Sequence, residues 1–488
     1  MYQIAVYGYL IGLRVGKAFP MQLWNQWWSW VEPLRGACSR ARSFLWLAAA
    51  IAGMSIRGDL LGVTGIIRAL GFCERFYDRL LDFFHSPAVD VDALTRFWVK
   101  TVFQRLPGIY RSNGRPVLLG DGIKIPKRGR KMPAVKLLHQ VSESNTKPEY
   151  IMGHSIQVVS LLVSAASSFF AVPLSARIHE GLVFSNRDHR TLPGKFLSLV
   201  ETLGIQEPVY LVADAYYACR TIALGLTAAG SHLISRLRKN AVAYEPVPQT
   251  GAKRKRGRPK LYGRKIRLFS LFDNSDDGWT TADSPVYGEK GVTIRYRCLD
   301  LVWRPIRRLA RFVCVEHPHR GRIIFLCTDL SLNPIEIIRL YGLRFKIELS
   351  FKQAVRTIGV YAYHFWMATM DSIRRRSGNQ YLHRKTATYR DAVRRKLAAY
   401  HRHIQVGLIA QGILQCLAIT APDLVWSRFG SWLCTIRKGI PPSELVVMTA
   451  LRNSFPDFLA RSTPGLIFTK FLRDRIDLNR AEGLRLVS

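Results

Sequence analysis

The chain has 488 residues, of which 48% are hydrophobic, so it can bury a large core and is long enough for roughly two to four domains. Lys and Arg number 72 against 34 for Asp and Glu, which gives a formal net charge of +38. This excess indicates a polyanionic partner, either nucleic acid or an acidic membrane surface. The alternative is a ribosome-like or merely basic soluble protein.

The membrane alternative has little support in the sequence. A transmembrane helix needs about 18 or more apolar residues, and the best candidate, residues 43–56, is shorter and is followed at once by Arg57. The apolar N-terminus lacks a preceding positive residue and a small-residue cleavage site, so it is not typical of a signal peptide. The eight cysteines include no CxxC pair. We therefore expect a reduced, cytoplasmic protein without a membrane partner.

Residues 1–110 are predicted to be a mostly helical, DNA-binding region. Within them, residues 58–86 carry apolar residues at helical spacing, interrupted by Gly71. A helix, a glycine turn and a second helix are the outline of a helix-turn-helix unit, but a plain helical hairpin has the same outline. The pattern leaves both interpretations open.

Residues 111–244 show a different pattern, with strands as well as helices. The run 114–126 is a predicted strand that contains Asp121, and two further strand-like runs follow it. Residues 207–230 predict an apolar strand, then Asp214, then a helix. Strands in a meander, followed by strands that alternate with helices, predict a mixed α/β sheet.

Residues 245–322 are predicted to be a β-rich insertion, because short alternating runs are separated by Gly, Pro and Asp. Near their start, Arg256, Gly257, Arg258 and Pro259 are similar to the core of an AT-hook, which lies in a narrow A·T minor groove. A flexible basic loop that binds phosphates is the alternative. Both interpretations place Arg256 and Arg258 on DNA.

Residues 323–400 are predicted to complete the core and to contain one long helix over 332–359. Asn333 can cap the first turn of this helix, and Gly359 ends it. The remaining segment, 401–488, is predicted to be largely helical.

At about 100° per residue, the polar side chains of the long helix form one stripe: Tyr341, Arg344, Glu348, Lys352 and Arg356. Apolar residues occupy the other sides, so the helix is predicted to be mostly buried. A solvated face is the ordinary explanation of a polar stripe. An aromatic ring, a carboxylate and three cations on one face of a buried helix favour a site, in which the carboxylate holds a metal and the cations hold phosphates.

Two further carboxylates, Asp121 and Asp214, lie in or directly after predicted strands. Each of them alone is more simply explained as a turn or cap residue. Together with Glu348 they form a set of the oxygen ligands that Mg²⁺ prefers, and two-metal nucleases bring such acids together from separate elements. Asp121, Asp214 and Glu348 are therefore the candidate metal ligands and catalytic residues.

Residues 323–352 resemble the bacterial insertion-sequence transposases of the DDE class. The signature of that family is Tyr, two residues, Arg, three residues, Glu, six residues and Lys. Tyr341, Arg344 and Glu348 match it in identity and spacing, whereas the position of the final Lys is Val355. Lys352 and Arg356, the other two cations of the stripe, flank this position and could replace the missing Lys.

The resemblance implies an RNase H-like α/β fold, in which a mixed sheet is flanked by helices and interrupted by the β-rich insertion, with helical N- and C-terminal regions. The segments around Asp121 and Asp214 resemble the strands that carry the first two acids of the family. Asp121, Asp214 and Glu348 would then bind two Mg²⁺ or Mn²⁺ ions. Water and then a DNA 3′-hydroxyl would attack phosphodiesters in turn.

The resemblance also implies the partners. These are double-stranded DNA, both at the ends of the element and in the target, and a second copy of the chain, with 401–488 as a candidate dimerisation region. Tyr341, Arg344 and Lys352 would contact DNA phosphates near the cleaved strand. Trp303 in the insertion could stack on a base, although core packing explains it better.

The expected function is cut-and-paste DNA transposition in a prokaryotic cell. One rival is a metal-dependent nuclease with the same core that does not join DNA strands. The other is a DNA-binding relic without catalytic activity. DNA products whose strands have been joined would separate the transposase from the nuclease.

Overall fold

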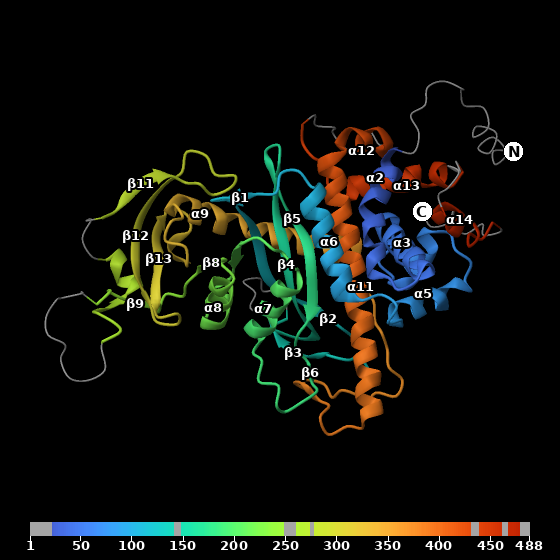
Figure 1. Cartoon of the computed structure of the whole chain (residues 1–488), viewed down its shortest axis with the longest axis horizontal. Coiled ribbons are helices and arrows are strands. Elements are labelled where there is room, and N and C mark those ends of the chain that lie inside the picture. Colours follow the sequence, from blue (N-terminus) through green and yellow to red (C-terminus); the bar gives the residue numbers. More distant parts are fainter. Residues whose placement is uncertain are drawn as a thin grey trace.

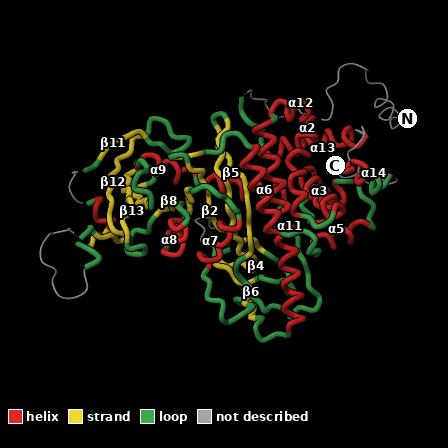
Figure 2. Tube along the Cα trace, in the orientation of Figure 1, coloured by secondary structure: helices red, strands yellow, loops and turns green. Residues whose placement is uncertain are grey.

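The computed structural model describes residues 22–140, 148–247, 260–273, 278–430, 439–460 and 467–478. The molecule is elongated, with a β-rich part at one end, a sheet covered by helices in the middle, and a helical bundle at the other end (Figure 1). Figure 2 shows the same division, because most strands lie in the first two parts and most helices in the third. Arg256 and Arg258 lie outside the described residues.

The helical bundle combines segments from both ends of the chain. Its helices are α2 (Gln22–Val31), α3 (Ala41–Ile56), α4 (Val63–Ala69), α5 (Phe76–His85), α6 (Val91–Arg105), α11 (Ala387–Thr420), α12 (Pro422–Phe429), α13 (Glu444–Ala460) and α14 (Ile467–Arg473). Aromatic rings join the two groups: Trp24 of α2 stacks on Phe458 of α13 with ring centroids 4.9 Å apart. The predicted N- and C-terminal helical regions therefore share one core.

Helices α4 and α5 occupy the segment in which a helix-turn-helix or a plain hairpin was predicted. Gly71 lies directly after α4 with φ +66°, a left-handed conformation that glycine adopts without steric cost. The helix, turn and second helix are therefore present. DNA contact by this segment stays a prediction.

Helix α11 runs through the centre of the bundle. Among the described residues it is the one helix that is long and apolar enough to span a membrane, but 89% of its apolar window is buried inside the protein. It packs against α3, α13 and the strand β5 (Ser168–Ile178). The central helix of a large core has this composition. The sequence-based search, which took 43–56 as the best candidate, missed it.

The middle of the molecule is a mixed sheet in the order β5-β4-β2-β7-β8. The other strands are β4 (Tyr150–Ala165), β2 (Arg115–Pro126), β7 (Tyr210–Ala213) and β8 (His232–Arg236). Strands β5, β4 and β2 are antiparallel neighbours, whereas β2, β7 and β8 are parallel. Helices α7 (Leu192–Thr202) and α8 (Arg220–Ala228) follow strands of this sheet. This order confirms the predicted RNase H-like α/β fold class.

The predicted insertion consists mostly of strands, and they extend the same sheet. They are β9 (Val242–Tyr244), β10 (Lys265–Arg267), β11 (Thr280–Asp283), β12 (Thr293–Trp303), β13 (Arg308–His317) and β14 (Gly321–Cys327). The last of them, β14, pairs antiparallel with β8. Trp303 ends β12 and is only 5% exposed in the main core, which agrees with the core packing that explained this residue better than stacking on a base.

Side chains alternate between the two faces of the central sheet, as the two-residue period of a strand requires. On β2, Leu118 packs into the larger core with α7 and α8, whereas Val117 and Leu119 pack into a second core. This second core contains the apolar side of α9 (Pro334–Leu343) and α10 (Phe345–Gln353). The odd-numbered residues in the first half of β2, Val117 and Leu119, therefore face α9 and α10.

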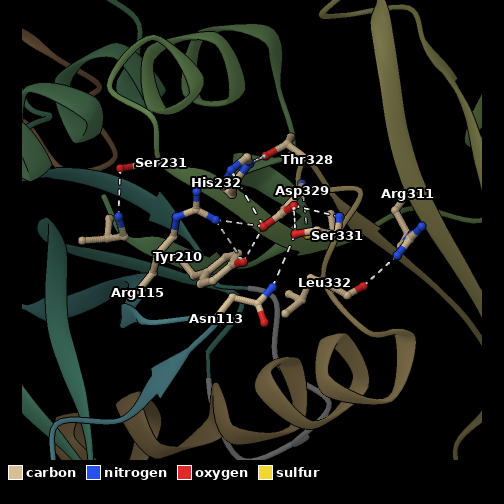
Figure 3. A network of polar contacts seen from close by, with 12 residues as sticks. Asn113, Arg115, Tyr210, Ser231, His232, Arg311, Thr328, Asp329, Ser331 and Leu332 are labelled. Atoms are coloured by element: carbon tan, nitrogen blue, oxygen red, sulfur yellow. Dashed lines mark hydrogen bonds and ion pairs between the residues drawn. The ribbon is translucent and has the colours of Figure 1, made fainter. Parts of the chain in front are cut away.

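A buried polar network joins the sheet just after β14 (Figure 3). The Asp329 carboxylate accepts hydrogen bonds from the Tyr210 hydroxyl at 2.5 Å and from the Arg115 guanidinium at 3.0 Å. Its other oxygen accepts from the backbone N–H of Ser331 at 2.8 Å and from the Ser331 hydroxyl at 2.7 Å. Because Tyr210 is on β7 and Arg115 on β2, the network ties three separate strands together.

Replacing Asp329 by Asn is expected to lower the free energy of unfolding at pH 7 by roughly 2–3 kcal/mol, the usual loss for hydrogen bonds to a charged group. Burial alone would raise the pKa of Asp329, but hydrogen bonds from Tyr210 and Ser331 lower it to about 2. A depressed folded-state pKa contributes stability above the unfolded value of about 3.9, and this contribution is lost as the pH falls towards about 2. Urea unfolding at several pH values should therefore show the two proteins converging in acid.

The matched control is Asp391→Asn, which removes an exposed carboxylate on α11 whose one ion-pair partner among the described residues is Arg394, three residues away. It should change stability little at any pH. Equal losses for Asp329→Asn at pH 7 and at pH 3 would contradict the role of the charged carboxylate.

Candidate active site

The two predicted aspartates lie side by side at one edge of the parallel strands. The pairing of β2 with β7 ends at Gly120 and Ala213, so Asp121 and Asp214 are the next residues on their strands. Both continue the alternation of the strands towards the face covered by α9 and α10, since Val212 belongs to that core. Catalytic groups commonly lie at this carboxyl edge of parallel strands.

Backbone contacts hold both carboxylates in place. The N–H of Gly122 donates to Asp121 at 2.7 Å, and the N–H of Ala215 donates to Asp214 at 2.6 Å. The hydroxyl of Ser235, on β8, donates to the backbone oxygens of Ala213 and Asp214 at 2.9 and 3.1 Å. Nothing in the sequence distinguished Ser235 from an ordinary strand residue.

The helix that carries the polar stripe is interrupted twice, so the predicted continuous helix is wrong in detail. Asn333 caps α9, as predicted, by accepting from the N–H of Ile335. The first interruption is at Arg344, between α9 and α10, and the second is a π-helical turn over Ala354–Ile358. Gly359 ends the helix with φ +69°, as predicted.

Arg344 connects this helix to the sheet. Its Nη1 lies 2.5 Å from a carboxylate oxygen of Asp121, and its Nη2 lies 3.0 Å from one of Glu348. Its guanidinium also lies over the ring of Tyr341, 5.6 Å from the centroid. Arg344 is predicted to contact a DNA phosphate. In this structure its guanidinium instead pairs with the two carboxylates.

The charges of the site perturb one another. Burial raises the pKa of Asp121; the Arg344 guanidinium and the N–H of Gly122 oppose this rise, and the carboxylates of Asp214 and Glu348 add to it. Burial by itself would lower the pKa of Arg344, but Asp121 and the other acidic groups around it raise it. Asp121, Asp214 and Glu348 are thus close enough for each of them to affect the pKa of Arg344.

The three carboxylates are hard oxygen donors of the kind that Mg²⁺ and Mn²⁺ bind. Among the described residues, no group of three His, Cys, Asp or Glu side chains is close enough to hold a metal ion as it stands. Arg344 supplies the positive charge between Asp121 and Glu348. The Glu348 side chain is 57% exposed, so it can turn away from Arg344 without repacking the core. The donor set therefore fits a divalent ion once Arg344 changes partners.

The remaining stripe residues lie in solvent. Lys352 and Arg356 are exposed, and neither has a hydrogen-bond or ion-pair partner among the described side chains. Leu349 and Val355 are also 46% and 39% exposed. The prediction that the helix is mostly buried is therefore wrong for its second half. The two cations are free to bind phosphates, but they do not touch the carboxylates.

A polar chain on the other face of the sheet supports the site. The buried Tyr217, three residues after Asp214, accepts a hydrogen bond from Gln157 at 3.1 Å, and Gln157 contacts His179 at 2.5 Å. Burial raises the pKa of Tyr217, and Asp121 and Asp214 contribute to this rise. The position of Tyr217 shortly after Asp214 was a signal in the sequence that the prediction did not use.

Comparisons with known proteins place these observations in a wider group. No curated protein matches the chain. Among solved structures, the piggyBac transposase synaptic complex with hairpin DNA is similar at 13% identity over 93% of this chain and 84% of that chain, with a TM-score of 0.36. This likeness is too weak to support an argument.

The family comparison is stronger. Residues 33–298 match the family model described as DDE superfamily endonuclease. The matched range includes Asp121 and Asp214 and ends before Glu348. The assignment of Glu348 as the third acid therefore rests on its ion pair with Arg344. Because the match extends over more than half of the chain, this protein belongs to the DDE superfamily endonucleases.

Proposed function

We propose that this chain is a cut-and-paste DNA transposase of the bacterial insertion-sequence type with a Tyr-Arg-Glu-Lys signature. The observation that carries the proposal is that Arg344 pairs with both Asp121 and Glu348, while Asp214 lies beside Asp121 at the carboxyl edge of β2 and β7. A sheet edge with three acids in a protein of net charge +38 suits metal-assisted cleavage of a polyanion.

In the proposed reaction Asp121, Asp214 and Glu348 would hold two divalent ions, Mg²⁺ or Mn²⁺. Bound ions of this kind activate the attacking oxygen and stabilise the leaving oxygen of a phosphodiester displacement. Arg344 is released from the carboxylates and becomes available to a DNA phosphate, still oriented by the ring of Tyr341. Lys352 and Arg356 extend the positive surface along the exposed side of the helix.

The proposed partners are double-stranded DNA and a second copy of the chain. A net charge of +38 over 488 residues supports DNA as the ligand. Joining both ends of an element to one target requires that two active sites be held together, which is the reason for proposing a homodimer.

The test uses a plasmid that carries the DNA flanking this gene, with both inverted ends, incubated with the protein and Mg²⁺. Every product end is mapped for the wild type and for Glu348→Gln, which keeps the shape of the side chain but removes its charge. We expect cleavage at the repeats and joined products with the wild type, and neither with the variant.

Other products would identify a rival function. Cleavage without joining would support a nuclease that lacks strand transfer. DNA binding without cleavage by either protein would support a DNA-binding relic. Cleavage that persists in Glu348→Gln would exclude Glu348 from the catalytic set.

A further inference from the structure

A basic cavity opens directly beside Asp214. It has a volume of about 350 Å³, within the range of roughly 300–1,000 Å³ that ligand sites occupy. Its walls come from the end of β8 and from the insertion, and its cationic lining residues are Arg236, Arg238, Lys239 and Arg322. None of these residues was singled out by the sequence analysis.

The cations near β8 are not neutralised by the protein. Arg322, on the insertion side, is paired with Asp273 at 2.6 Å and Glu316 at 3.1 Å. By contrast, Arg236 and Arg238 are exposed and have no ion-pair or side-chain hydrogen-bond partner among the described residues. The side of the cavity formed by the end of β8 therefore carries an unmatched positive charge.

Lys239 is held over an aromatic ring. Its ammonium lies 5.6 Å from the centroid of Phe269, which also lines the cavity. A cation–π contact of this kind orients the ammonium without neutralising it. The cavity thus combines an oriented lysine with two unpaired arginines.

Strand register places this charge next to the catalytic acids. The pairing of β7 with β8 ends at Ala213 and Ser235, so Asp214 and Arg236 are adjacent at the same edge of the sheet. Ile234 belongs to the core beneath α9 and α10, so Arg236 continues the alternation towards the same face as Asp121. An anion bound here is therefore a direct neighbour of the phosphodiester at the acids.

We propose that this cavity binds a backbone phosphate of the DNA strand next to the phosphodiester that is cleaved. The inference rests on the proposed function for the identity of the strand, and it adds Arg236, Arg238 and Lys239 as DNA-positioning residues. A continuous strand supplies phosphates at regular spacing, so one phosphate at the acids brings its neighbour within reach of the cavity. A free small anion has no covalent link to a phosphodiester at the acids and would not be held beside Asp214 in this way.

The first test measures DNA binding without divalent ions, so it does not depend on catalysis. The double variant Arg238→Ala/Lys239→Ala is compared with Arg96→Ala/Lys100→Ala, which removes the same two kinds of charge from the exposed face of α6. The probe is a fluorescent 30-base-pair duplex in EDTA, titrated over a range of salt concentrations. Removing one to two phosphate contacts should reduce the salt slope of log K by about 1–2 and weaken binding roughly tenfold near 0.1 M salt.

The second test locates the phosphate. Once the cut is mapped, neutral methylphosphonate is placed at single positions within about two nucleotides of it. At one position it should weaken binding by the wild type but cause no further loss in the cavity variant. Arg238→Lys/Lys239→Arg keeps the charge and should restore the salt slope.

The outcomes separate the two proposals. A cavity variant that keeps the wild-type salt slope, or that loses no more than the α6 variant, overturns the cavity proposal and leaves the transposase function intact. Absence of DNA binding by the wild-type protein overturns both. Unchanged thermal unfolding of each variant would show that a loss of binding is not a loss of fold.

Discussion

Asp121→Asn is expected to reduce the rate of DNA cleavage by roughly 10³-fold or more, because it removes a charged catalytic group without changing the shape of the site. Asn at this position can still accept the hydrogen bond from the N–H of Gly122 through its one amide oxygen, whereas the oxygen that accepts from Arg344 is replaced by an NH2 group, which is a donor. It cannot supply the negative charge that a divalent ion needs. The expected loss corresponds to about 4 kcal/mol or more of transition-state stabilisation.

DNA binding by this variant should be equal to or tighter than that of the wild type. The substitution removes a negative charge from the site and leaves Arg344 paired with Glu348 alone, so the guanidinium is more available to phosphate. The measurement is single-turnover cleavage with excess protein, combined with anisotropy of the same labelled DNA. Asp391→Asn is the control, because it removes an exposed carboxylate outside the site. Undiminished cleavage by Asp121→Asn would show that the catalytic acids lie elsewhere.

The positions of Asp121 and Asp214 could be predicted because they depend on local pattern. Each follows or lies within an apolar run, and parallel pairing of β2 with β7 then brings the two acids to one edge. Residues 332–359 likewise carry a helical pattern with a cap at Asn333 and a stop at Gly359. Short-range signals of this kind survive in the folded chain because the tertiary contacts agree with them.

The partners of Arg344 could not be predicted, because they depend on contacts between distant segments. The spacing of Arg344 and Glu348 allows an ion pair within the helix. The contact with Asp121 requires that the helix be placed against β2, and the two interruptions of the helix follow no signal that the sequence displays. For the same reason the union of the first and last helices in one bundle was not foreseen.

Arg57 is the clearest case of a residue whose role the sequence conceals, since it was noted only as the charge that ends an apolar run. In the structure it is 1% exposed. It donates to the backbone oxygen of Ile358 at 2.9 Å, of Gly359 at 2.9 Å and of Gly62 at 3.0 Å. A cation at the end of a helix also interacts favourably with the helix dipole. The N-terminal bundle is thereby attached to the end of the helix that carries Glu348.

Replacing Arg57 by Met is expected to lower the free energy of unfolding by about 2–5 kcal/mol, because buried carbonyl oxygens lose a charged donor and each acceptor left unsatisfied costs roughly 1–3 kcal/mol. Methionine fills much of the space but removes the guanidinium that donates to these three carbonyl oxygens. Gly359 still accepts from the N–H of Ala362, so the main loss is at Ile358 and Gly62, and a buried group that loses its donor is costly. Burial lowers the pKa of Arg57 to about 10, while Asp59 opposes this, so the group is still charged at pH 7. Urea unfolding at pH 7 measures the change.

The control for Arg57→Met is Arg68→Met, which removes the same charge from a 41% exposed side chain in the neighbouring helix α4. This control should change stability by less than about 1 kcal/mol, as is usual for exposed ion pairs. If Arg57→Met were no more destabilising than Arg68→Met, the carbonyl of Ile358 would have to find another donor, and the bundle would not depend on this contact. A large loss for Arg57→Met alone would instead show that the N-terminal helices stabilise the catalytic helix from the end opposite to Arg344.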